Sequence, residues 1–166
     1  RSRHTLGKVI FAGVGNTLAG DDGAGIHMVR ELRKRLPAAE RIQFIELEGD
    51  LYQIWDLLPG TDAILFLDAI AGDVPGEIKV GKTLPRAYTP SFHESDLSAV
   101  LKSLEIIYDG DFPKWTLWGV TIDPPRELGE GLSEPVRRAA DAAVKEIMER
   151  LEEGGFQIEG HTVCTN

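Results

Sequence analysis

Two aspartates and a histidine are the side chains of this sequence whose types and positions suit a common site. Asp22 follows a glycine-rich stretch, and Asp68 lies near the end of an apolar run over residues 63–69. His93 lies just before an expected helix. Two carboxylate oxygens and an imidazole nitrogen form a mixed ligand set that suits a first-row divalent metal and leaves positions open for water or substrate. The sequence therefore predicts that Asp22, Asp68 and His93 bind one divalent metal ion.

Each of these residues also has a simpler interpretation when it is considered alone. Asp22 precedes a helix, where an aspartate commonly caps the first turn. Asp68 could cap the turn after its strand, although a carboxylate in so apolar a run needs a partner to offset its desolvation. His93 could be an exposed loop histidine. The metal-site interpretation depends on a fold that brings the three side chains together.

The glycine-rich stretch, residues 13–25, does not fit the common phosphate-binding motifs. The dinucleotide fingerprint G-x-G-x-x-G requires a third glycine where this chain has Leu18. The phosphate loop G-x-x-x-x-G-K-[ST] can be aligned over residues 15–20, but Asp21 and Asp22 then replace the lysine and the hydroxyl residue. Two carboxylates at that point would repel a phosphate.

A receiver-like phosphoacceptor domain is an alternative interpretation of the same acids. Such a domain also has an acidic pair after its first strand and an aspartate at the end of its third, and Asp21, Asp22 and Asp68 match that arrangement. It further needs a lysine at the end of its last strand, and residues 115–120 contain none. This alternative predicts that a small phosphodonor phosphorylates Asp68.

The elements expected around these residues alternate between strands and helices. Apolar runs predict strands at residues 8–12, 41–47, 63–69 and 115–120, and alternation after the Pro75-Gly76 turn predicts an edge strand at 77–80. Helical spacing of apolar residues predicts helices at residues 26–36, 51–58, 97–104 and 136–151. We therefore expect an α/β fold with a doubly wound, mostly parallel sheet and helices on both faces. Ligands of such sheets bind beyond the carboxyl ends of the strands.

Polar residues and a proline mark the expected helix ends. Either Asp21 or Asp22 is expected to cap the first helix, and Pro37 to end it. Asp50 is expected to cap the short second helix, and Ser133 to cap the last one.

Length and cysteine content favour one domain in a reducing compartment. A chain of 166 residues, of which 42% are apolar, can bury one core of ordinary size. We expect a single domain over residues 1–166, with its core at about 8–151 and tails at 1–7 and 152–166. The one cysteine, Cys164, cannot form an internal disulfide, and no run is apolar enough to span a bilayer. We therefore expect a cytoplasmic protein.

The net charge bears on the partners that this chain can bind. A formal charge of −9 repels nucleic-acid backbones and anionic lipid surfaces, so we expect neither nucleic acid nor membrane as a partner. Basic residues cluster at Arg30, Arg33, Lys34 and Arg35. They alternate with apolar residues at helical spacing, which is typical of the solvated face of a helix.

Several motifs together give the chain a specific resemblance. They are Gly13-x-Gly15-Asn16-x-Leu18-x-x-Asp21-Asp22-Gly23-x-Gly25, Asp68-Ala69, Pro75-Gly76, His93, Gly119-Val120 and Gly131-Leu132-Ser133-x-Pro135-Val136. With this combination, which extends over most of the chain from residue 8 to about 151, the sequence resembles the nickel-iron hydrogenase maturation proteases.

The resemblance implies an endopeptidase that removes the C-terminal extension of a nickel-iron hydrogenase large-subunit precursor after nickel insertion. It implies that Asp22, Asp68 and His93 recognise the nickel of the substrate, and that another divalent metal can occupy the site in the isolated protein. The general base stays unassigned, because the usual Asp-Gly-Gly after the second strand reads Glu48-Gly49-Asp50 here. No Ser-His-Asp, Cys-His or H-E-x-x-H arrangement is visible. A nickel-sensing chaperone or scaffold that binds the same subunit without cleaving it is an alternative.

Overall fold

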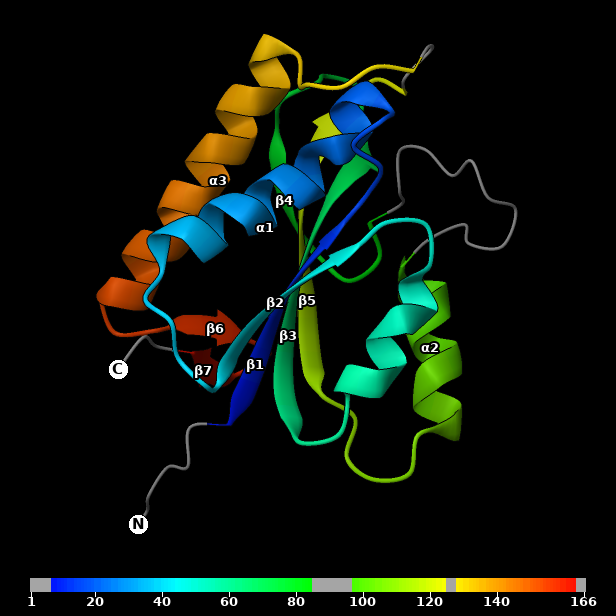
Figure 1. The fold of residues 1–166 in the computed structure, drawn as a ribbon, viewed down its shortest axis with the longest axis vertical. Coiled ribbons are helices and arrows are strands. Elements are labelled where there is room, and N and C mark those ends of the chain that lie inside the picture. The colour runs from blue at the N-terminus through cyan, green and yellow to red at the C-terminus, as the bar shows by residue number, and fades with distance from the viewer. Residues whose placement is uncertain (1–6, 85–96, 125–127, 164–166) are drawn as a thin grey trace.

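A five-stranded sheet forms the centre of the molecule (Figure 1). The computed structural model describes residues 7–84, 97–124 and 128–163. The strands lie in the order β2-β1-β3-β5-β4, and only β4 runs antiparallel to its neighbour. Their bounds are β1 Lys8–Val14, β2 Ile42–Leu47, β3 Thr61–Ala71, β4 Ile78–Gly81 and β5 Lys114–Ile122. The expected α/β fold with a mostly parallel sheet is confirmed.

Helices cover both faces of the sheet (Figure 1). One face carries the long helices α1 and α3, and the other carries α2 and the 3-10 helix η2. A second 3-10 helix, η1, leads into α1. The bounds are η1 Gly20–Gly23, α1 Ala24–Arg35, η2 Leu51–Leu57, α2 Leu97–Ile107 and α3 Glu134–Glu152. In the ranges that the structure describes, no helix has the length and the apolar character required to cross a membrane.

Strand β3 supplies side chains to two separate cores. Leu65 and Leu67 pack in the core beneath α1 and α3, whereas Phe66 and Ile70 pack in the core beneath α2 and η2. This two-residue alternation explains why the strand is a continuous apolar run, because both of its faces are buried. Asp68 falls between Phe66 and Ile70 in the second series, so its side chain is directed toward the α2 and η2 face.

Two of the expected helix ends are as predicted. The Asp50 carboxylate caps η2 by accepting a hydrogen bond of 2.9 Å from the backbone N–H of Tyr52. Helix α1 ends at Arg35, two residues before Pro37. A proline cannot supply the backbone N–H of a continuing helix.

The expected cap of α1 is wrong. The N-cap residue of α1 is Gly23, without a side-chain capping bond, because Asp21 and Asp22 belong to the preceding 3-10 turn. Ser133 does occupy the N-cap position of α3, but its side chain does not cap that helix. Its hydroxyl group instead bonds to Asp21.

A small hairpin extends the fold beyond the expected core. Strands β6 Phe156–Ile158 and β7 His161–Val163 pair antiparallel, within the residues expected to form a tail. Phe156, Ile158 and Val163 are buried in the core beneath α1 and α3, and the Phe156 ring centroid lies 5.4 Å from that of Trp118. The expectation of a tail is therefore wrong over residues 156–163. Cys164 lies outside the described residues.

Candidate functional site

The candidate site lies where the neighbouring parallel strands β1 and β3 reach one edge of the sheet. Their register pairs Gly13 with Leu67, so β1 ends at Val14 on the level of Asp68. The chain then passes through η1, and η1 contacts β3. Asp22 in η1 and Asp68 in β3 consequently lie at the same edge of the sheet, where ligands of parallel α/β folds bind.

Asp68 is completely buried in an apolar strand. Its Oδ1 atom accepts a hydrogen bond of 2.7 Å from the backbone N–H of Ala69. The residue beside it in β5 is Gly119, and the Ile70 side chain fills the space that a larger residue would occupy there. Because β3 continues through Ala71, Asp68 does not cap a turn. Burying a carboxylate away from water costs free energy, so a carboxylate that stays buried is a candidate for a functional group.

Asp22 is also buried, with an exposed fraction of only 1%. Its position depends on Gly15, which has a φ angle of +148° and whose backbone approaches the Asp22 carbonyl group. A Cβ atom at Gly15 would lie 2.1 Å from the Asp22 carbonyl oxygen. That oxygen also accepts a hydrogen bond of 3.2 Å from the backbone N–H of Asn16. The glycine thus lets η1 fold back onto the end of β1 and brings Asp22 to the site.

Two other loops hold the glycine-rich loop in place. On one side, the Thr17 backbone N–H donates a hydrogen bond of 3.0 Å to Glu48 Oε1. On the other, Gly129 N–H donates to the Leu18 carbonyl group and Gly20 N–H donates to the Gly129 carbonyl group, both at 2.8 Å. Glu48, which stands where the family usually has an aspartate, therefore supports the loop that carries Asp22.

His93, the third predicted ligand, lies outside the described residues. The structure consequently bears on Asp22 and Asp68 alone. In the ranges 7–84, 97–124 and 128–163, no three His, Cys, Asp or Glu side chains form a group that could hold a metal ion. The two aspartates supply oxygen ligands of the kind that divalent metals accept, and a complete set needs a further ligand.

The geometry disfavours the receiver-like alternative. The carboxyl end of β5 reads Gly119-Val120-Thr121-Ile122 and has no lysine to hold a phosphoryl group. Both carboxylate oxygens of Asp21, the first acid of the pair, accept hydrogen bonds from Ser133.

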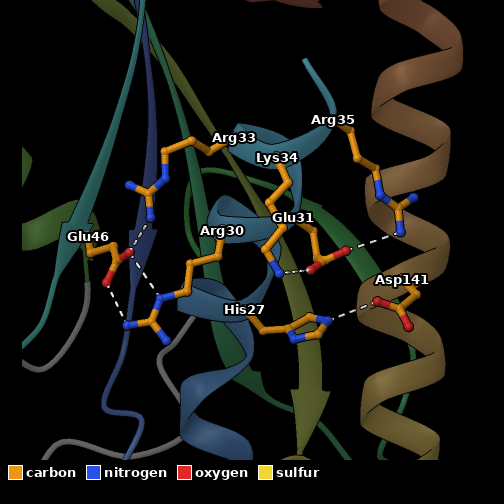
Figure 2. Close-up of polar contacts among 8 residues, drawn as sticks. All are labelled: His27, Arg30, Glu31, Arg33, Lys34, Arg35, Glu46 and Asp141. Carbon is orange, nitrogen blue, oxygen red and sulfur yellow. Dashed lines mark hydrogen bonds and ion pairs between the residues drawn. The ribbon is translucent and has the colours of Figure 1, made fainter. Parts of the chain in front are cut away.

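The basic residues of α1 lie on the outer face of that helix and bond to acids (Figure 2). Arg30 forms two hydrogen bonds with Glu46 of β2, at 3.0 and 2.9 Å, and Arg33 adds a third at 2.6 Å. The two bonds from Arg30, followed by the one from Arg33, hold the pKa of Glu46 below its usual value. These contacts agree with the predicted solvated helix face and give no indication of a nucleic-acid site.

A cavity of about 640 Å³ borders the glycine-rich loop on the side of α1 and α3. Thr17 and Gly20 line it, together with charged residues of both helices. Asp22 and Asp68 do not line it. Its basic groups include Arg30, which is paired with Glu46, so the cavity gives no clear sign of an anion-binding site.

Comparison with known proteins identifies the family. Residues 26–150, more than half of the chain, match the profile of the hydrogenase maturation protease family. The chain is 28% identical to the protein FrxA of Pyrococcus furiosus over 141 residues, covering 81% of this chain and 98% of the relative. It is 26% identical to the hydrogenase 2 maturation protease of Escherichia coli K12 over 157 residues, covering 90% of this chain and 94% of the relative.

A solved structure has the same fold. It is the hydrogenase maturating endopeptidase HybD of Escherichia coli, which superimposes with a TM-score of 0.72 at 24% identity. The superposition covers 88% of this chain and 93% of that structure. The family profile includes the positions of Asp68 and His93, whereas Asp22 lies four residues before its start. The chain therefore belongs to the hydrogenase maturation protease family and is a peptide hydrolase that acts in hydrogenase maturation.

Proposed function

We propose that this hydrolase removes the C-terminal extension of a nickel-iron hydrogenase large-subunit precursor once nickel has been inserted. Asp22, Asp68 and His93 recognise the nickel that the precursor carries. The observation that supports the proposal best is the burial of Asp22 and Asp68 at one edge of the sheet, in a chain of this family. Such a pair attracts a cation held by a substrate, and this attraction is missing when the substrate lacks the cation.

The residues have distinct parts in this proposal. Ionised Asp22 and Asp68 each offer carboxylate oxygens, and a neutral His93 offers a ring nitrogen lone pair. The nickel remains part of the substrate, so its other positions are filled by groups of the precursor. Engagement at the site fixes the precursor relative to the enzyme, which accelerates hydrolysis of the nearby peptide bond by orienting the reacting groups. The general base that activates water is unassigned, and polarisation of the scissile carbonyl by the metal is a secondary contribution.

A cleavage assay tests the proposal. Nickel-loaded and nickel-free precursor are incubated with the enzyme, and the products are weighed by mass spectrometry. We expect loss of a C-terminal peptide from the loaded precursor alone. Asp22→Asn, Asp68→Asn and His93→Ala should each abolish cleavage, whereas Asp56→Asn, at an exposed position on η2, should cleave normally. Equal cleavage of both precursors would refute the recognition of nickel.

The same experiment separates the alternatives. A scaffold would bind the nickel-loaded precursor and leave its mass unchanged, and binding without cleavage would support that function. Incorporation of phosphate at Asp68 from a small phosphodonor would support the receiver-like interpretation. The cytoplasmic location stays a prediction from the single cysteine, and cell fractionation tests it.

A further inference from the structure

The two adjacent aspartates of the glycine-rich loop differ in their surroundings. Asp22 is buried at the sheet edge, whereas both carboxylate oxygens of Asp21 bond to Ser133, 112 residues further along the chain. The Ser133 backbone N–H donates to Asp21 Oδ1 at 2.6 Å, and the Ser133 hydroxyl donates to Asp21 Oδ2 at 2.8 Å. Both short bonds involve a charged acceptor, which makes them stronger than bonds between neutral groups.

These bonds anchor the loop to the start of α3. Ser133 is the N-cap residue of α3, yet its side chain makes no capping bond to the first turn. The Asp21 carboxylate instead lies beside the N-terminus of the helix, where the peptide dipoles favour a negative charge. Helix α3 has 19 residues and a buried stripe that includes Val136, Val144 and Ile147. Asp21 is therefore attached to an element that the core holds firmly.

Asp22 is consequently fixed from two directions. Its carbonyl group accepts the N–H of Asn16 near the end of β1, as described above. One residue earlier, the Asp21 side chain reaches α3. A rotation of the Asp22 backbone would break contacts on one side or the other.

We propose that Asp21 is a positioning residue of the hydrolase site, which holds Asp22 in place through Ser133. The two adjacent acids thus have different roles: Asp22 meets the substrate, and Asp21 sets the orientation of Asp22. The part assigned to Asp22 rests on the proposed function, whereas the attachment of the loop to α3 does not.

Three variants remove the contact between Asp21 and Ser133 to different extents. Asp21→Asn removes the charge but preserves both partners, because the amide oxygen accepts from the Ser133 N–H and the amide NH₂ donates to the Ser133 hydroxyl oxygen. Ser133→Ala loses one bond, and Asp21→Ala loses both. We expect kcat/KM for nickel-loaded precursor to stay within about threefold for Asp21→Asn and to fall about 100-fold for Asp21→Ala, the effect of a displacement of about 1 Å in a site. Ser133→Ala should lie between them.

A matched control separates positioning from stability. Val144→Ala opens a small cavity beneath α3, away from the loop, and should lower Tm as Asp21→Ala does while retaining cleavage. Equal loss of kcat/KM in Val144→Ala and Asp21→Ala at matched Tm would reduce Asp21 to a stabilising role. An Asp21→Asn variant as inactive as Asp22→Asn would show that the Asp21 charge itself takes part in the chemistry. Either result overturns the proposal.

Hydrogen exchange makes the test independent of the proposed function. The Asn16 N–H, which bonds to the Asp22 carbonyl oxygen, should exchange at least about tenfold faster in Asp21→Ala than in the unaltered protein or in Asp21→Asn, because local opening controls such exchange. Unchanged exchange would overturn the proposal even in an active enzyme. If the unaltered protein fails to cleave the precursor but Asp21→Ala still speeds exchange, the proposed function fails and the loop attachment stands.

Discussion

At the scale of single residues, burial distinguishes the acids that the sequence brings together. Asp21, Asp22 and Asp68 were all candidates for one acidic cluster, and only Asp22 and Asp68 are buried. The sequence places an aspartate in an apolar run, which predicts a special role for Asp68. It gives no sign that Asp21 bonds to Ser133, because that contact depends on how α3 packs beside the glycine-rich loop.

Asp68→Asn tests whether the buried carboxylate is needed for its charge. The amide has nearly the same shape, and its oxygen can still accept the Ala69 N–H. We expect kcat/KM for nickel-loaded precursor to fall at least about 100-fold, because one of two anionic ligands is lost. The variant should stay folded, since the side chain keeps nearly the same size and shape. Cleavage rates and urea unfolding are measured for the variant. Unchanged cleavage would show that Asp68 does not take part in the site.

Glu46 gives a prediction about pH. Because the bonds from Arg30 and Arg33 lower its pKa in the folded state, its stabilising effect is present above the pKa of the unfolded chain, about 4.3. That effect is lost as the pH falls from there through the folded-state value. Glu46→Gln should lower the free energy of unfolding by about 0.5 kcal/mol at pH 7, since the arginine side chains are about half exposed, and by less at pH 3.

Urea titrations at several pH values measure this difference. Glu40→Gln, at an exposed position in the loop before β2, serves as the control and should show no such pH-dependent effect. A Glu46→Gln difference that grows at low pH would contradict the assigned ion pairs.

At the scale of elements, the sequence predicted most of the architecture correctly. Apolar runs identified four strands of the sheet, alternation identified β4, and helical spacing identified the buried stripes of α1, α2 and α3. These patterns are strong because each element is long enough to repeat its period several times. The start of α1 was predicted wrongly. The acids at residues 21–22 suggested a cap, but the turn there is a 3-10 helix, which contacts β3 and accepts a hydrogen bond from Asn16 in the loop after β1.

Gly25 tests the contact between α1 and the sheet. A Cβ atom at this position would lie 2.1 Å from the Leu67 carbonyl oxygen and 2.3 Å from that of Val14. Both obstacles are backbone atoms of the sheet and cannot move aside cheaply. Gly25→Ala should therefore lower the free energy of unfolding by about 3 kcal/mol, as expected of overpacking. It should also reduce cleavage, because α1 follows directly from η1 and Asp22.

Gly129→Ala is the control for this substitution. Its Cβ atom would meet nothing within 4 Å, so the free energy of unfolding should change by less than about 0.5 kcal/mol. Urea unfolding measures both variants. A Gly25→Ala variant as stable as Gly129→Ala would show that α1 can shift away from the sheet without loss.

At the scale of the whole molecule, the hairpin of β6 and β7 was the largest feature that sequence patterns missed. Each strand has only three residues, too few to establish an alternating pattern. The hairpin is buried by contacts with β5 and with the core beneath α1 and α3, and the sequence of the hairpin itself does not reveal such contacts.

Phe156→Ala measures the contribution of this hairpin. The Phe156 side chain has an exposed fraction of 1% and packs against Trp118. Its truncation should lower the free energy of unfolding by about 3–5 kcal/mol, through lost burial and the cavity left behind. Gln157→Ala, at the exposed position between the two buried residues of β6, should cost less than about 1 kcal/mol. Equal effects of the two substitutions in urea unfolding would mean that the hairpin does not belong to the core.

The division of the core into two layers also has an optical consequence. Trp118 belongs to the layer beneath α1 and α3, whereas Trp115 and Trp55 pack in the layer beneath α2 and η2. Each layer therefore contains its own fluorophore, and variants that keep a single tryptophan report on one layer at a time. Coincident emission changes during denaturation would indicate that the layers melt as one cooperative unit. Separate transitions would assign a stability to each side of the sheet.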